Sequence, residues 1–155
     1  MDNNTIYKLI PLIIVFKAMA DPTYYLDING LSKHLNNRHE VEEKYNERNY
    51  GFGLTRENKN NRLIQILLAG GYKNSFGNPS YYAGAGLAKR FGKNNYMDVG
   101  VMGGGVSGYA NKLTAMAGPF LTLGQKDKGR LRLIYLPKTD ENDATVMANL
   151  GIPIR

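Results

Sequence analysis

From Thr23 to its C-terminus the chain divides into extended segments separated by clusters of Asn, Gly, Lys and Pro. Three connections are short, at 58–61, 92–95 and 125–129, and they carry the Asn, Gly and Asp residues that tight hairpins need. An even number of hairpin-linked strands can close on itself and leave no free sheet edge. We therefore predict an all-β fold, an eight-stranded antiparallel up-and-down β-barrel. The predicted strands are 24–35, 50–57, 62–73, 80–91, 96–108, 112–123, 130–136 and 144–154.

Composition and alternation favour the same fold. The chain has 18 Gly, 11 Tyr and no Trp, and it is rich in β-branched residues, which argues against a helical protein. Leu131 and Leu133 alternate with Arg130 and Arg132, as expected for a strand with two different faces. The segment 63–69 is apolar at nearly every position, so we expect a lumen that is not wholly filled with water.

The first twenty residues have the pattern of a secretory signal peptide. A polar start is followed by the apolar run 9–16 and by the small-residue cleavage pattern Ala18-Met19-Ala20. Such a short run cannot cross roughly 30 Å of hydrocarbon as a helix. We expect cleavage after Ala20, with residues 1–20 as signal peptide and 21–155 as the barrel domain.

Charge and cysteine content exclude several classes of function. The net charge of +7 falls to +6 without residues 1–20, and the sequence has no basic patch with interleaved aromatic residues, so we expect no nucleic-acid partner. A modest positive charge suits a surface dense in lipid phosphates. Because the chain has no Cys, it has no disulfide, no cysteine nucleophile and no cysteine metal ligand, and we expect neither metal nor cofactor.

Two kinds of closed barrel fit these patterns, an outer-membrane barrel and an exported soluble lipocalin-like barrel. The signal peptide, the lack of Cys and the short turns opposite longer loops favour the outer-membrane type, with strands long enough to cross a membrane. The C-terminal sequence 152–155 opposes it, because it lacks a terminal aromatic residue. We expect a monomer in the outer membrane.

Strand counting places two reactive side chains at one rim. His34 ends the first predicted strand and Ser75 follows the third, and odd-numbered strands of an up-and-down barrel end on the same side. A hydroxyl beside an imidazole can become an activated nucleophile, or the imidazole can act as general base toward a lipid hydroxyl. Both routes lead to acyl transfer, although a rim His beside a turn-forming Asn-Ser pair is also a common surface feature.

Several short motifs resemble the PagP family of outer-membrane lipid A palmitoyltransferases. They are Tyr45-Asn46-Glu47-Arg48, the segments 51–56 and 72–76, Ala83-Gly84-Ala85-Gly86, and Tyr135-Leu136-Pro137, in order over about 24–154. The resemblance implies a barrel with an interior acyl pocket that moves a palmitoyl group from a phospholipid to lipid A. It also implies His34 and Ser75 as catalytic residues, with Asn74 at the position of a family Asp.

The departure at Asn74 keeps a second function open. Asn74 cannot ionise, so it cannot stabilise an imidazolium as a carboxylate does. A non-enzymatic PagP-like barrel with a structural or surface-interaction role is therefore the main alternative to the enzyme, and an exported soluble lipid-binding barrel is the third.

Overall fold

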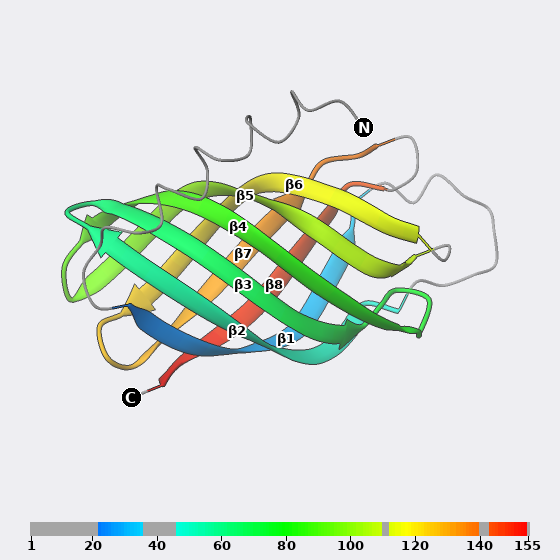
Figure 1. Ribbon diagram of the computed structural model, residues 1–155, viewed down its shortest axis with the longest axis horizontal. Helices are drawn as coiled ribbons and strands as arrows, with labels where there is room; N and C mark the ends of the chain where they lie inside the picture. Colours follow the sequence, from blue (N-terminus) through cyan, green and yellow to red (C-terminus); the bar gives the residue numbers. More distant parts are fainter. Residues whose placement is uncertain (1–21, 36–45, 110–111, 140–142, 155) are drawn as a thin grey trace, which may run out of the picture.

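All eight extended segments form strands, and the strands close into one antiparallel barrel (Figure 1). The computed structural model describes residues 22–35, 46–109, 112–139 and 143–154; the predicted signal peptide lies outside the described residues. No helix long and apolar enough to cross a membrane occurs within these ranges. The strands are β1 (Thr23–His34), β2 (Arg48–Asn60), β3 (Leu63–Lys73), β4 (Pro79–Gly92), β5 (Asn95–Tyr109), β6 (Lys112–Gln125), β7 (Gly129–Leu136) and β8 (Thr145–Ile154).

Each strand pairs with the next, and β1 closes the barrel by pairing with β8 from Tyr24↔Ile154 to His34↔Thr145. Both ends of the barrel sequence therefore lie at one opening, which also holds the short β2–β3, β4–β5 and β6–β7 turns; we call it the turn mouth. The other opening, the loop mouth, holds the β1–β2, β3–β4, β5–β6 and β7–β8 connections. The predicted position of odd strand ends at one rim is thus confirmed.

The tight turns follow local backbone chemistry. Asn61 and Asp127 adopt positive φ angles of 53° and 61°, and Gly92 one of 85°, and these residue types tolerate left-handed backbone best. The predicted strand 50–57 was too short, because β2 continues to Asn60, which pairs with Leu63. The polar residues at 58–60 suggested a loop, but their backbone groups complete the ladder.

The barrel interior is filled at mid-height by an apolar core. Its buried residues come from alternate positions of β3, β4, β6 and β7, and Leu68, Met102, Leu136 and Met147 pack against them. This arrangement confirms the expectation that the lumen is not wholly aqueous. The core residues are Ile64, Ile66, Ala88, Phe120 and Ile134.

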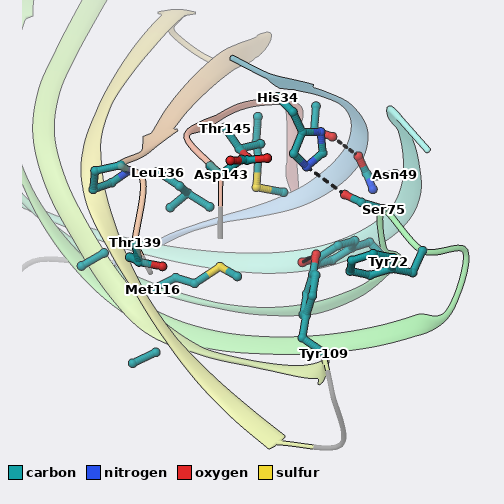
Figure 2. Close-up of a pocket in the computed structure, with 16 residues that line it drawn as sticks. His34, Asn49, Tyr72, Ser75, Tyr109, Met116, Leu136, Thr139, Asp143 and Thr145 are labelled. Carbon is teal, nitrogen blue, oxygen red and sulfur yellow. Dashed lines mark hydrogen bonds between the residues drawn. The ribbon is translucent and has the colours of Figure 1, made fainter. Parts of the chain in front are cut away.

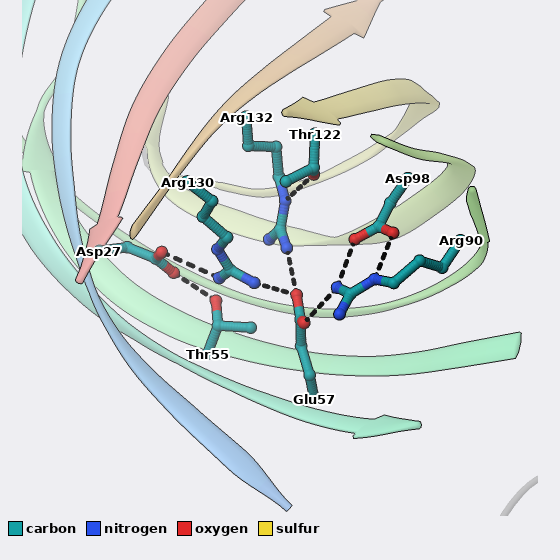
Figure 3. A network of polar contacts seen from close by, with 8 residues as sticks. All are labelled: Asp27, Thr55, Glu57, Arg90, Asp98, Thr122, Arg130 and Arg132. Carbon is teal, nitrogen blue, oxygen red and sulfur yellow. Dashed lines mark hydrogen bonds and ion pairs between the residues drawn. The ribbon is translucent and has the colours of Figure 1, made fainter. Parts of the chain in front are cut away.

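Toward the turn mouth, charged side chains replace the apolar core (Figure 3). Glu57 accepts bonds from Arg130, from Arg132 at 2.8 Å and from Arg90 at 3.4 Å. Arg90 also holds Asp98 through two bonds of 2.7 Å. Arg130 pairs with Asp27 at 3.1 Å, and Thr55 donates to the same carboxylate. Three carboxylates thus balance three guanidinium groups, as buried charges require.

Large apolar side chains cover the outside of the barrel. Phe52, Leu54 and Val101 are 65%, 57% and 62% exposed, while their strand neighbours point inward. The tyrosines divide between the two faces of the barrel, and Tyr24, Tyr50 and Tyr81 are exposed on the outside, the face an interfacial aromatic belt would need. Tyr25, Tyr82 and Tyr96 are not, because they lie at inward positions: Tyr25 and Tyr96 are buried, and Tyr82 contacts Asn29.

Candidate functional site

His34 and Ser75 meet inside the loop mouth (Figure 2). His34 is the last residue of β1 and Ser75 follows the end of β3, so β2 separates their strands in the sheet. Both side chains turn inward, and Ser75 Oγ lies 3.3 Å from His34 Nε2, within hydrogen-bonding distance. The two residues that strand counting assigned to one rim are therefore in direct contact.

Asn74 lies directly before Ser75 in the turn between β3 and β4. Its side chain is fully buried and forms the β3–β4 turn: Oδ1 accepts from the backbone N–H groups of Phe76 and Asn78 at 3.0 and 2.9 Å. Its Nδ2 donates to Ser80 Oγ at 3.1 Å and to the Gly108 carbonyl at 2.9 Å. Asn74 thus supports Ser75 by fixing the turn that carries it.

Two consecutive hydrogen bonds below the rim hold the start of β2 against β1 and β3. Ser32 Oγ donates to Asn49 Oδ1, and Asn49 Nδ2 donates to the Lys73 carbonyl at 2.9 Å. Both side chains are buried and line the same cavity as His34 and Ser75, and Figure 2 shows Asn49 beside that pair. Since buried polar groups with satisfied bonds hold a fixed geometry, these bonds keep the β1 and β3 ends at a constant separation.

The His34–Ser75 pair borders a cavity of about 120 Å³. Tyr72 and Tyr109 both line it, with their hydroxyl groups in contact at 3.2 Å. A second cavity of about 100 Å³ lies deeper and is lined mainly by apolar residues and by glycines of β4 and β5. The two cavities share Tyr72, Met116, Leu136 and Met147.

The cavity reaches the barrel wall where β6 and β7 part. Their ladder runs from Gln125↔Gly129 to Phe120↔Ile134 and stops there. Beyond it, Pro119 on β6 and Pro137 after β7 have no N–H to donate, so the ladder cannot continue regularly. Ala115 and Ala117 of β6 and Leu136 and Pro137 line the cavity along this seam. Along this seam the cavity lies against the barrel wall, while at Gly118 the two strands stay in close contact, because a side chain there would meet the Tyr135 carbonyl.

Burial and nearby carboxylates act in opposite directions on the pKa of His34, and burial has the larger effect. His34 is the last residue of β1 and lies at the loop mouth, where its outward neighbour Lys33 is exposed and pairs with Glu47 at 2.8 Å. Burial lowers the pKa of His34 below its ordinary value of 6.5, against the opposing effects of Glu47 and Asp143, while Lys33 adds to the lowering. A neutral imidazole can accept a proton at Nε2.

Sequence analysis did not identify several lining residues, among them Asp143, which faces the same cavity from the β7–β8 connection (Figure 2). Asp143 lies more than one hundred positions after His34 and belongs to no motif, so the sequence carries no signal for it. Within the described ranges, no group of His, Cys, Asp or Glu side chains could hold a metal ion.

No protein-family model matches the chain, and no curated protein matches it. Two solved structures of one protein are similar in fold. The Yersinia pestis outer membrane protein Ail in a phospholipid bilayer nanodisc has a TM-score of 0.51 and 14% identity, covering 86% of this chain and 100% of that one. Ail in complex with the heparin analogue sucrose octasulfate has a TM-score of 0.48 and 15% identity, covering 87% and 100%. The nanodisc structure is thus similar to this barrel in fold.

Proposed function

We propose that the protein is exported to the outer membrane, stays monomeric there, and transfers an acyl chain from a phospholipid to lipid A. The observation that carries this proposal is the contact of 3.3 Å between Ser75 Oγ and His34 Nε2 in a cavity that continues into an apolar one. The ordered motifs that resemble the PagP family, from 45–56 to Tyr135-Leu136-Pro137, point to the same chemistry.

Three features support a membrane location. The exposed outer side chains of the barrel are largely apolar. Exposing such a surface to water is unfavourable in free energy, whereas contact with lipid chains is not. The N-terminal residues 1–20 have the pattern of a signal peptide. The fold is similar to that of an outer membrane protein studied in a bilayer. An apolar exterior of this extent disfavours the exported soluble barrel.

The proposed reaction uses one proton acceptor and one nucleophile. His34 Nε2 takes the Ser75 hydroxyl proton while Ser75 Oγ attacks the acyl carbonyl of the phospholipid. The ester bond to glycerol breaks, and the glycerol oxygen takes the proton from His34 and leaves as a lysophospholipid. A lipid A hydroxyl then attacks the acyl-serine, gives its proton to His34 and receives the acyl chain, while the proton returns to Ser75.

The cavities suit this substrate class. The deeper cavity, lined by Leu68, Met102 and the glycines 103–105, would receive the distal part of the acyl chain. The apolar core and the ion network close the barrel below it, so the chain would enter a blind space. The seam between β6 and β7 would let the chain enter sideways from the bilayer.

Mass spectrometry of lipid A tests the proposal. The protein is expressed in cells that lack their own palmitoyltransferase, and an added acyl chain on lipid A is the expected product. Ser75→Ala and His34→Ala are expected to reduce it at least about 100-fold, in the range of general base or nucleophile loss. Ser107→Ala is the control, because Ser107 bonds to the Tyr81 backbone and lies outside the site. A folded protein that adds no acyl chain would refute the enzyme.

The second candidate function is a non-enzymatic outer-membrane barrel. The position of Asn74 favours it, because the motif supplies no carboxylate to His34 and uses its side chain to build the turn. In that case lipid A stays unmodified, and His34→Ala leaves every phenotype unchanged.

A further inference from the structure

The outer wall of the barrel carries a groove beside the loop mouth. Gly71 of β3 lies between Phe52 of β2 and Tyr81 of β4, which are its direct partners in the two ladders. All three occupy outward positions, and together with Tyr50 they border an open space of about 560 Å³ on this wall. A single strand thus forms the floor, and its two neighbours supply aromatic walls.

The groove is open to the surroundings of the barrel. Tyr50, Phe52 and Tyr81 are 63%, 65% and 68% exposed, among the highest values for large apolar side chains here. A Cβ added at Gly71 would lie 3.1 Å from the Tyr81 ring, so a larger side chain at this position would fill the floor. The width of the groove therefore depends on the absence of a side chain at Gly71.

A lysine side chain, that of Lys73, lies at the loop-mouth end of the groove. Lys73 lies two residues beyond Gly71 on the same face of β3, is exposed, and lines the groove. Within the part of the chain that the structure describes, no carboxylate forms an ion pair with Lys73, whereas Lys33 on the same rim is paired with Glu47. Among the described residues, the exposed ammonium group of Lys73 thus differs from that of Lys33 in facing the surroundings without a carboxylate partner.

We propose that this groove binds lipid A, with one acyl chain lying over Gly71 between the aromatic rings and a phosphate at Lys73. An apolar slot that ends in an ammonium group matches an acyl chain that ends in a phosphorylated head group. The proposal rests on the function proposed above, because lipid A borders the loop mouth only if the barrel has that orientation in the outer membrane.

The groove also has a consequence for the reaction. Lys73 is two residues before Ser75, so a lipid A head group held by Lys73 lies at the rim that carries the His34–Ser75 pair. The β6–β7 seam lies on another part of the wall. Acceptor and acyl donor would thus approach the same cavity from two sides of the barrel.

Native mass spectrometry of the folded protein in detergent tests the groove, with lipid A, phosphatidylglycerol or phosphatidylethanolamine added in separate titrations. We expect lipid A adducts on the unaltered chain and about tenfold weaker binding for Lys73→Gln, the size of one charge-assisted bond. Gly71→Val should also weaken binding. Lys89→Gln, which changes an outward lysine near the turn mouth, should leave binding unchanged.

The outcomes separate this inference from the enzymatic proposal. Heat-modifiable gel migration shows that each variant is folded, and Lys73→Gln alone decides the result if Gly71→Val does not fold. Equal lipid A binding by the unaltered chain and Lys73→Gln overturns the groove site. An equal or larger effect of Lys73→Gln on phosphatidylglycerol overturns the assignment to lipid A. Loss of adducts in Lys73→Gln without any acyl transfer by the unaltered chain leaves the binding site standing and removes only the enzyme.

Discussion

At the scale of single residues, the distinctive feature is an imidazole and a hydroxyl from non-neighbouring strands in contact at a half-enclosed mouth. Two carboxylates, Glu47 and Asp143, act on the imidazole through space, and each raises its pKa against the larger effect of burial. The balance of these effects decides over which pH range His34 can accept a proton.

The first residue-scale prediction concerns Asp143. Because Asp143 raises the pKa of His34, Asp143→Asn should lower that pKa further. Acyl transfer needs the neutral imidazole, so the rate falls as the pH drops through the pKa of His34. This fall forms the acidic limb of the pH–rate profile. In the variant the acidic limb should move to lower pH. The pH dependence of transfer, or an NMR titration of the His34 ring, measures the shift.

Asp127→Asn is the matched control for Asp143→Asn. Asp127 lies in the β6–β7 turn at the turn mouth, and Asn tolerates its positive φ of 61° as well as Asp does. It should leave the acidic limb in place. An acidic limb that stays in place or moves to higher pH in Asp143→Asn would contradict the electrostatic assignment.

At the scale of elements, the β3–β4 turn depends on one buried amide. Asn74 accepts from two backbone N–H groups within the turn, and its two donated bonds hold the turn against Ser80 of β4 and Gly108 of β5. Asn74→Ala leaves the N–H groups of Phe76 and Asn78 without this acceptor. We expect a loss of about 2–4 kcal/mol in the free energy of unfolding, measured by urea titration of the refolded barrel.

Asn74→Asp tests whether the residue of the resembling family can replace Asn here. One carboxylate oxygen would still accept the two backbone bonds, but the other would face the Gly108 carbonyl, which cannot donate. We expect destabilisation and no gain in acyl transfer, since the group points away from His34. Asn78→Ala is the control because its side chain is exposed, and its effect should stay within about 0.5 kcal/mol. Higher activity in Asn74→Asp would contradict the structural role.

At the scale of the whole molecule, the interior has three levels: the reactive mouth, the apolar core and the ion network. The network links strands that are far apart in the sequence, since Glu57 of β2 bonds Arg130 and Arg132 of β7. Such pairs form only when the barrel has closed, so they report on the complete fold.

Glu57→Gln should therefore destabilise the entire barrel. Removing this carboxylate leaves three guanidinium groups with two carboxylates in a buried setting, at a cost of about 3–5 kcal/mol. Lys33→Gln breaks an exposed pair and should cost at most about 1 kcal/mol. Urea unfolding of both variants in the same detergent compares them. Equal effects would show that the network adds no more stability than a surface pair.

The sequence by itself determined the number of strands, their alternation and the mouth at which His34 and Ser75 lie, because these properties follow from local periodicity and from counting. Only the tertiary structure decided which charges share the interior, where the β6–β7 ladder stops, and that Asn74 faces Ser80 and Gly108 and not His34. The physical reason is that closure of the barrel brings side chains of non-neighbouring strands together across its interior, and a period of two residues gives only the face on which a side chain lies, not the partner it meets there.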